Sequence, residues 1–452
     1  MLQSTTQKRG SYLVVPYLTF FLLLSVWSVM QPQYTWDLLG YIGSSVDSTD
    51  AKAIHRAVFD AIRPISSSPD IQVDNPYRAD VAANPYHFAE QLPFYSIKPV
   101  YVALVKLTHR AGLPFPKAAV SISAAANFIL AALLWLWLGS YLGGWSLLAS
   151  CTLIMLSPNI LALSRWATPD CLATAVAAIA LYLILERNLA FWGSALLIVN
   201  VWIRTDALVL AGIVFATLLL LRKLDALQFV SLSILALASY FTINHFSGSY
   251  GWAVLFYNSF FGGVPAPGEA VLHVSSRAYL HQLVRGSFLW LIYGSFALYL
   301  LLGALAIWLR KSINYSYMIA AVLAARVVSY ALYPNGDQRY TAVLYVLVLV
   351  SLVIAIRQSV SVSDSQPAAA FANAPVRAEK GWSSKFALRL NHPDNSATSW
   401  CILVVPLFAR CAAVHANSQL GHAFHQGLCL IQPIVTRFGW PNIRKHRLSA
   451  GS

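Results

Sequence analysis

Hydrophobic residues occur along this chain in long blocks, not in the alternation typical of half-buried strands. A helix needs about 20 apolar residues to cross a bilayer, and several blocks are shorter, so we expect their helices to extend into the flanking polar turns. The pattern predicts ten membrane-spanning helices, at Tyr12–Met30, Ala118–Leu138, Ser146–Leu163, Cys171–Glu186, Leu189–Ile203, Ala207–Leu221, Ala226–Ile243, Ser287–Leu309, Tyr315–Tyr333 and Tyr340–Ile356.

Composition narrows the class of protein. Of the 452 residues, 58% are apolar and 11% are charged, and the mean hydropathy is +0.60. A soluble domain needs far more polar surface, so we predict an all-α membrane protein, a polytopic helical bundle. Lys8 and Arg9 precede the first block and no small-residue cleavage site follows it, which favours an uncleaved first span with a cytoplasmic N-terminus.

One basic segment decides the topology. Ile97–Gly112 could either cross the bilayer or lie on its surface. If it lies flat, the pairs Arg222-Lys223 and Arg310-Lys311 fall on the cytoplasmic side, in agreement with the positive-inside rule. We therefore predict an amphipathic surface helix at this position and ten spans in total.

This topology predicts a membrane domain over residues 1–356. Its first extracytoplasmic loop, 31–117, bears surface helices and holds eight of the seventeen acids. A second outer loop, 244–286, is rich in aromatic, Gly and Pro residues. It fits either a partly ordered lid or an interfacial aromatic belt with a slack connection. Residues 357–452 are expected to form a cytoplasmic, disordered tail.

The net charge of +14 does not indicate a nucleic-acid partner. Basic residues mark cytoplasmic segments, and the tail alone has ten Lys and Arg against three acids, or +7. The five cysteines form no extracellular disulfide framework, and the Cys and His residues of the tail match no standard zinc spacing. We assign no metal ligand.

Asp37 is the candidate catalytic residue. It lies seven residues beyond the first span, in the sequence Trp-Asp-x-x-x-Tyr that ends at Tyr41. A carboxylate close to the membrane surface can act as a general base on a hydroxyl or an amine. The alternative is a solvated loop acid.

The stretch from Ser164 to Asp170 ends the third span and begins the fourth. Thr168 is a plausible N-cap, Pro169 suits the first helical position, and Asp170 meets the positive end of the helix dipole. Arg165 and Asp170 could equally bind a charged head group at the mouth of a cavity.

Further charges are predicted on the same outer face. Arg204 and Asp206 separate spans five and six, where Asp206 could cap a helix and Arg204 could bind phosphate or reach lipid phosphates. Asp337 and Arg339 follow a Pro-Asn-Gly turn and are free for an ion pair or a ligand. Arg326, near the middle of span nine, is the one charge at bilayer depth and so a functional candidate, although a buried structural pair is an alternative.

Together these residues resemble the GT-C superfamily of membrane glycosyltransferases, particularly the polyprenyl-phosphate-sugar enzymes that include protein mannosyltransferases and bacterial lipid A aminoarabinose transferases. The likeness covers roughly residues 10–356 and lies in the order of its parts. These are an early loop acid (Asp37), a Lys-Pro-x-Tyr surface helix (Lys98 to Tyr101), Ser-Arg-x-x-Thr-Pro-Asp (Ser164 to Asp170), a charged turn after span five, and a late Asp-x-Arg-Tyr (Asp337 to Tyr340).

The resemblance implies inverting transfer of a sugar from a polyprenyl-phosphate donor to a glycan, lipid or protein acceptor. Asp37 matches the catalytic carboxylate, Asp170 matches the second outer-loop acid, and Arg204 or Arg339 would meet the donor phosphate. Ile97 stands where aminoarabinose transferases carry a Glu, which argues against a metal site in the first loop. No cofactor is assigned, and a divalent metal stays an open alternative.

The implied location is a cell membrane, such as a bacterial inner membrane, with the active site on the extracytoplasmic face. Two alternatives remain at this stage. One is a transporter or flippase of lipid-linked saccharides, which would concentrate ionisable groups at the midplane and show repeated halves. The other is an enzyme like the O-antigen ligases or polymerases, in which we would expect the large loop late in the chain.

Overall fold

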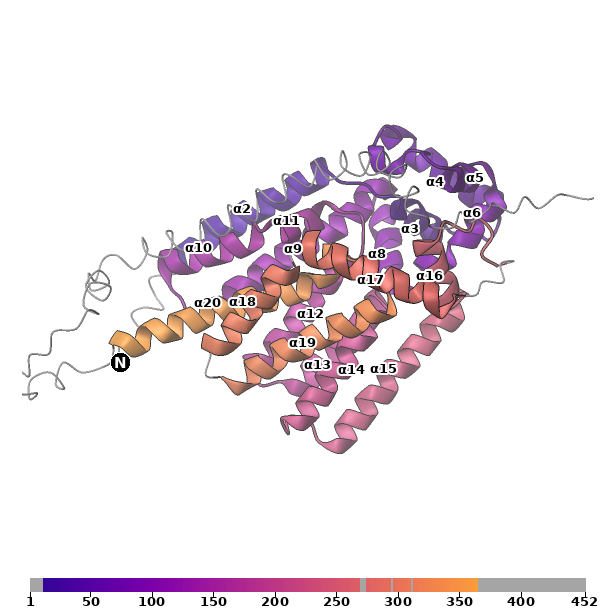
Figure 1. The fold of residues 1–452 in the computed structure, drawn as a ribbon. Coiled ribbons are helices and arrows are strands. Elements are labelled where there is room, and N and C mark those ends of the chain that lie inside the picture. The colour runs from indigo at the N-terminus through magenta and orange to yellow at the C-terminus, as the bar shows by residue number, and fades with distance from the viewer. Residues whose placement is uncertain (1–10, 269–273, 294–295, 310–311, 365–452) are drawn as a thin grey trace, which may run out of the picture. The chain divides into compact units, whose positions relative to one another are not determined.

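The computed structural model describes residues 11–268, 274–293, 296–309 and 312–364, and these form helices joined by turns, without a β-strand (Figure 1). Every predicted apolar segment coincides with helix. The bounds of seven helices lie close to the predicted ones: α2 Ser11–Met30, α9 Phe115–Leu138, α12 Asp170–Leu185, α13 Ala190–Ile203, α14 Ala207–Leu220, α15 Ala226–Ser247 and α19 Ile313–Leu332. The last helix, α20, is Ala342–Asp364.

Five helices of the described residues are long and apolar enough to cross a membrane: α2, α9, α15, α19 and α20, the last counted together with the turn before it. Four further apolar helices, α12, α13, α14 and α18, have between 10 and 17 residues. The chain is therefore an all-α protein with helices suited to a bilayer.

The span predicted at Ser146–Leu163 is broken. It consists of α10 (Gly144–Met155) and α11 (Pro158–Arg165), whose axes differ by 63°. Pro158 explains the break because proline cannot donate the helical hydrogen bond and suits the first position of a new helix. A window that averages hydropathy does not detect this bend.

The stretch predicted as a single span at Ser287–Leu309 is helical on both sides of residues 294–295, which lie outside the described residues. Two helices share this stretch, α17 (Ser276–Tyr293) and α18 (Phe296–Leu309). Because α17 begins in polar sequence, its start lies well before the apolar block. The predicted second outer loop therefore contains part of α17 and the whole of α16 (Trp252–Phe260).

The last helix is longer than predicted. α20 continues past Arg357 to Asp364, so the first eight residues of the predicted tail continue this helix. The remainder of the predicted tail, residues 365–452, lies outside the described residues.

The first outer loop is a layer of short helices with a hydrophobic core. Its members are α3 Asp37–Ser45, α4 Ala51–Ile62, α5 Pro76–Ala83, α6 Pro85–Gln91, α7 Pro93–Ser96 and α8 Pro99–Arg110. Leu38, Val58 and Val105 are fully buried in this core. α3 approaches α7 closely at Gly40, where an added Cβ would lie 2.1 Å from the ring of Tyr95.

α8 has the place predicted for a surface helix. Its 12 residues span about 18 Å, too short to cross a bilayer. It packs on α3 and α9, and Tyr101 donates a hydrogen bond of 3.2 Å to the carbonyl of Ala119 in α9. Whether it lies flat on a membrane stays a prediction.

Residues 250–268, which we call the outer strap, are part of the predicted second outer loop and pack on the short helices. Gln91, at the end of α6, donates to the carbonyls of Val264 and Pro265, both at 2.9 Å. Glu90 receives a hydrogen bond from the amide of Gly268 at 3.0 Å. In Figure 1, α3 to α6 and α16 accordingly gather at one end of the helical bundle.

The long helices differ in how much surface they bury. α20 and α9 bury 67% and 61% of their apolar windows, whereas α15 buries 22% and α2 buries 28%. α12 contacts both α9 and α20, so these three helices form the centre of the bundle. Asp170 is the first residue of α12. It therefore lies near the centre of the bundle, at the end that is next to the short helices.

Candidate functional site

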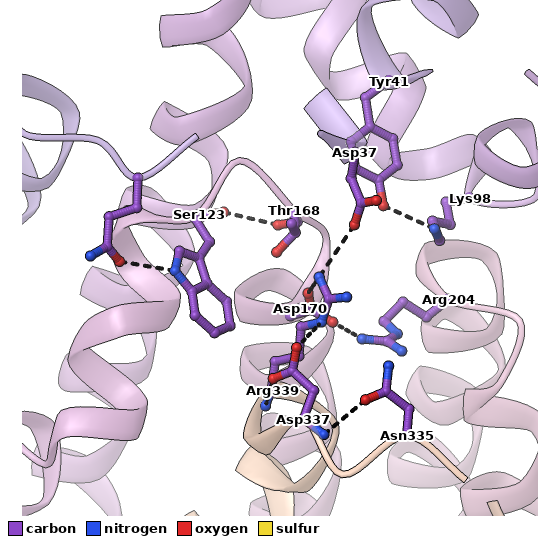
Figure 2. A network of polar contacts seen from close by, with 12 residues as sticks. Asp37, Tyr41, Lys98, Ser123, Thr168, Asp170, Arg204, Asn335, Asp337 and Arg339 are labelled. Carbon is purple, nitrogen blue, oxygen red and sulfur yellow. Dashed lines mark hydrogen bonds and ion pairs between the residues drawn. The ribbon is translucent and has the colours of Figure 1, made fainter. Parts of the chain in front are cut away.

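A cluster of charged side chains lies where the short helices meet the ends of the long ones (Figure 2). Asp37 is the first residue of α3, which follows directly on α2. Its Oδ2 accepts a hydrogen bond of 3.3 Å from Nη1 of Arg339. The Asp37 side chain is about one-third exposed, so its carboxylate is open to solvent or ligand on one side.

Arg339 lies in a single 3-10 turn, η3 (Gln338–Thr341), between α19 and α20. Asp337 caps this turn, because its Oδ1 accepts the backbone N–H of Arg339 at 3.1 Å, and its Oδ2 lies 2.9 Å from Nε of Arg339. Nη1 of Arg339 also lies 3.8 Å from Oδ2 of Asp170. One guanidinium group therefore touches three carboxylates.

Asp170 links two arginines. Its side chain is 3% exposed, and it forms an ion pair with Arg204 at Oδ1 and with Arg339 at Oδ2. The position of Asp170 in the first helical turn is as predicted, but the predicted cap by Thr168 is wrong. The hydroxyl of Thr168 is buried without a hydrogen-bond partner, because the chain packs it into the core, where the carbonyl of Thr168 accepts from Ser123 at 3.0 Å.

Arg204 and Asp206 form a bidentate pair, with hydrogen bonds of 2.9 and 2.7 Å. Asp206 does not cap α14 as predicted, since its carboxylate is engaged by Arg204. Burial tends to raise the pKa of Asp206, but the Arg204 guanidinium outweighs it and the pKa is lowered. Both groups therefore stay ionised at neutral pH.

Lys98 approaches the cluster from the N-terminal end of α8. Its Nζ donates a hydrogen bond of 2.9 Å to the hydroxyl of Tyr41 and lies over the rings of Tyr41 and Tyr95, at 5.0 and 5.6 Å from their centroids. Burial lowers the pKa of Lys98 to about 8, with the Asp37 charge opposing this change. Lys98 is thus a cation whose charge is sensitive to mildly alkaline pH.

A cavity lies beside the cluster, between α12, α13, α14, α19 and α20. It is open to solvent on one side and has a volume of about 80 Å³. Its polar wall contains Asp170, Arg204, Asp206 and Arg339, and its apolar wall contains residues such as Leu210 of α14. Asp37 is not among the lining residues, so Arg339 separates the cavity from the side on which Asp37 lies.

Arg326 also lines the cavity, from within α19, close to the position near the middle of this helix that the sequence predicts. It is six residues before the end of α19, and its Nη2 donates to the carbonyl of Asn335 at 2.9 Å. The long side chain thus reaches toward the turn at the end of the helix, as snorkelling arginines do.

Arg165 is the one predicted site residue that the structure places elsewhere. Its Nε donates to the carbonyl of Gln31 at 2.8 Å, and its guanidinium lies 4.9 Å from the ring centroid of Trp27. It secures the chain after α2 against the end of α11, where Gln33 and Trp166 form an isolated parallel bridge. The other nine, Asp37, Tyr41, Lys98, Asp170, Arg204, Asp206, Arg326, Asp337 and Arg339, lie in or beside the cluster.

Sequence reasoning did not assign roles to several residues that build the site. The ring of Tyr340 lies 4.6, 5.1 and 5.6 Å from the guanidinium carbons of Arg204, Arg339 and Arg326. An aromatic residue directly after Arg339 was visible in the sequence, but its contact with two arginines from other helices was not. Asn200, one helical turn before Arg204, also lines the cavity.

The arrangement can neutralise an anionic group and hold a carboxylate close to it. It does not fit a divalent cation well, because the oxygens of Asp37, Asp170, Asp206 and Asp337 are engaged by guanidinium groups. Among the described residues no group of three His, Cys, Asp or Glu side chains could hold a metal ion.

Comparisons of this chain with protein-family models, with curated proteins and with solved structures found no match.

Proposed function

We propose that the protein is an integral-membrane glycosyltransferase that transfers a sugar, with inversion, from a polyprenyl-phosphate donor to an extracytoplasmic acceptor. The observation that carries this proposal is the position of Arg339, which contacts both Asp37 and Asp170 at the edge of a cavity. Such a transfer requires a base for the acceptor and a cation-lined cavity for the donor phosphate. Asp37 and the cavity lie on either side of Arg339.

The cavity fits an amphiphilic donor. Its polar wall could hold a phosphate and sugar, while its apolar wall of residues from α14, α19 and α20 suits the first isoprene units. A lipid-linked donor has to enter from the bilayer, and helices of this length and hydropathy support a location in a membrane.

In the proposed reaction Asp37 acts as the general base. Its carboxylate takes the proton from an acceptor hydroxyl or amine as that atom forms a bond to the anomeric carbon. The bond between this carbon and the phosphate oxygen breaks, and the phosphate leaves with the bonding electrons. Arginines in the cavity stabilise the negative charge that develops on the phosphate.

A ten-span topology, with the site on the outer face, is part of the proposal. At the end of the bundle opposite the site, Glu186 accepts hydrogen bonds from Trp137, Tyr141 and Tyr315. Basic residues follow at the same ends of helices, namely Arg187, Arg222 and Lys223. Basic residues favour the cytoplasmic side, so the site end would face outward.

The position of the charged cluster favours an enzyme over a transporter. Transporters hold substrates and coupling ions near the bilayer midplane, whereas here the acids and all arginines of the cluster except Arg326 lie at helix ends and in the turns that join them.

The test is mass spectrometry of surface glycans, glycolipids and glycoproteins from cells with and without the gene. We expect a glycan, lipid or protein that loses one sugar residue when the protein is absent and regains it on complementation. Identical profiles in all three fractions would contradict the proposal.

A further inference from the structure

The cavity contains one arginine with a different environment from the other two. Arg326 is 7% exposed and lines the cavity from α19. Its guanidinium is held over the ring of Trp290, at 4.9 Å from the centroid, and by the carbonyl of Asn335 at 2.9 Å. These contacts fix its position without neutralising its charge.

Within the described part of the chain, Arg326 forms no ion pair. Arg204 has carboxylate oxygens of Asp170 and Asp206 within 4 Å, and Arg339 has those of Asp37, Asp170 and Asp337. The Nε of Arg326 is buried and lacks any hydrogen-bond partner. Asp206 is the acid whose charge acts most on Arg326, but it is not within 4 Å. A buried guanidinium with no carboxylate in contact is unfavourable unless an anion joins it.

A second polar group in the same cavity also lacks a partner. Asn200 of α13 is 2% exposed, and its side-chain oxygen is buried without a hydrogen bond among the described residues. Asn200 lies one turn before Arg204, whose backbone N–H donates to the Asn200 carbonyl at 2.8 Å. A buried acceptor of this kind needs an N–H or O–H donor.

The surroundings of these two residues are apolar. Leu210, Val322, Val343 and Leu344 line the cavity from α14, α19 and α20. A ligand that satisfies this wall has an apolar portion beside its polar group. Free phosphate would leave the apolar wall without a partner.

We propose that Arg326 and Asn200 form a subsite for a lipid phosphate that carries a hydroxyl group close to its phosphorus. Arg326 binds an anionic oxygen of the phosphate, and the oxygen of Asn200 accepts a hydrogen bond from the hydroxyl. The resemblance implies Arg204 or Arg339 for the phosphate, but both are already neutralised by acids. This inference deepens the proposed function, on which it rests for the identity of the ligand as the sugar donor.

Two sources could supply this chemistry, a polyprenyl-phosphate sugar and a phospholipid such as phosphatidylglycerol. The experiment measures dissociation constants for the full-length protein purified in detergent. The probes are farnesyl phosphate, its glucose phosphodiester, farnesol, inorganic phosphate and short-chain phosphatidylglycerol. We expect the phosphodiester or phosphatidylglycerol to bind most tightly, and farnesol and inorganic phosphate to bind at least tenfold more weakly.

The test variant is Arg326→Gln, and Arg165→Gln is the matched control. Arg165 also lies 4.9 Å from a Trp ring centroid and also donates to one backbone carbonyl, but outside the cavity. We expect Arg326→Gln to weaken binding of the phosphate probes at least tenfold, because a charge-assisted hydrogen bond is lost. Arg165→Gln should leave the dissociation constants unchanged.

Asn200→Leu tests the second contact. Measured at pH 8, where the phosphate monoester is fully ionised and carries no hydroxyl, it should weaken binding of the glucose phosphodiester and leave binding of farnesyl phosphate unchanged. Equal affinity of wild-type protein and Arg326→Gln for every phosphate probe would overturn the proposal. So would equal affinity of the wild-type protein for farnesol and farnesyl phosphate.

Folding of the variants is followed by their melting temperature without ligand. If Arg326→Gln does not yield folded protein, Arg326→Lys replaces it; this variant keeps the charge but loses the planar fork, and binding should weaken less. A purely structural Arg326 would lower the melting temperature of both variants and leave the affinity of the folded molecules unchanged, which would overturn the subsite.

The outcomes separate this subsite from the function itself. Binding that depends on Arg326, together with surface glycans that do not depend on the protein, would reject the glycosyltransferase and keep the subsite. Glycans that depend on the protein, together with binding that ignores Arg326, would reject the subsite and keep the glycosyltransferase.

Discussion

Asp37 and Arg339 are separated by 302 positions in the sequence, yet Nη1 of Arg339 lies 3.3 Å from Oδ2 of Asp37. The contact joins the first of the short helices to the turn before the last long helix. It brings the candidate base into the same charged network as Asp170, which has no direct contact with it among the described ion pairs.

The first prediction concerns the base. Asp37→Asn should reduce transfer at least about 100-fold, because the amide cannot accept the acceptor's proton. The measurement is the amount of the modified glycan, lipid or protein in complemented cells. Asp60→Asn is the control, since Asp60 is exposed and pairs only with Arg63 at the surface. Wild-type transfer by a folded Asp37→Asn protein would remove Asp37 from the mechanism.

The second prediction concerns the buried acid. Asp170→Asn should destabilise the protein by about 3 kcal/mol, because two buried guanidinium groups lose a partner. Thermal or denaturant unfolding in detergent measures this loss. Asp47→Asn is the matched control. Asp47 also bridges two basic residues, Lys106 and Arg110, but at the surface, where no measurable loss is expected. Equal stability of the two variants would contradict a buried network.

The third prediction concerns pH. Because burial lowers the pKa of Lys98 to about 8, its charge is lost as the pH rises through 8, and transfer that depends on this charge should fall there. The ordinary pKa of a lysine is 10.5, so between 8 and 10.5 the unfolded chain binds more protons at this residue. The contribution of Lys98 to stability therefore rises with pH over this window.

The variant Lys98→Arg stays charged and should keep its activity above pH 8 relative to its own maximum. Lys106→Arg, in α8, is the control, and its activity should depend on pH as that of the wild type does. The same alkaline loss in wild type and Lys98→Arg would assign it to another group.

The fourth prediction concerns the outer strap. Gln91→Leu removes the hydrogen bonds to Val264 and Pro265, so backbone amides in residues 250–268 should exchange with deuterium faster. Hydrogen–deuterium exchange with mass spectrometry measures this change. Gln72→Leu is the control, because among the described residues the side chain of Gln72 bonds to the carbonyl of Ser67 in its own loop and not to residues 250–268. Unchanged exchange in Gln91→Leu would show that the strap is held by other contacts.

The fifth prediction compares two capping positions. Asp50 caps α4 by accepting the amides of Lys52 and Ala53, both at 3.2 Å, and Asp50→Ala should cost about 1 kcal/mol. Thr168→Val should cost nothing or stabilise the protein, because its buried hydroxyl has no partner to lose. Unfolding measurements on both variants test this. A larger loss for Thr168→Val would restore Thr168 as a cap.

Hydrophobic blocks were sufficient to locate the helices because apolar length is the main requirement for a helix in a bilayer. They did not predict the break before Pro158, where a local backbone restriction ends one helix inside a uniform apolar block. They also did not predict the start of α17, which lies among polar residues. Ten crossings stay a prediction, since five helices among the described residues have the full length.

Candidate site residues could be chosen from the sequence because charges are rare in such a chain, and nine of the ten lie together. Their partners could not be chosen. Thr168 and Asp206 both matched capping patterns, but neither side chain caps a helix. Packing buries the hydroxyl of Thr168, and Arg204 attracts the carboxylate of Asp206 more strongly than the helix end does. Arg165 carries the same charge as Arg204 and also ends a helix, yet the bend at Pro158 directs it to Trp27.

The turn η3 connects two of the long helices and also carries Arg339. A shift of α20 along its axis by one residue moves this guanidinium by about 1.5 Å, half the length of the contacts that it makes. The carboxylates at the start of α3 and α12 therefore fix the depth of the last helix relative to its neighbours. A displacement of this helix would therefore change the contacts of Arg339 with Asp37 and Asp170 together.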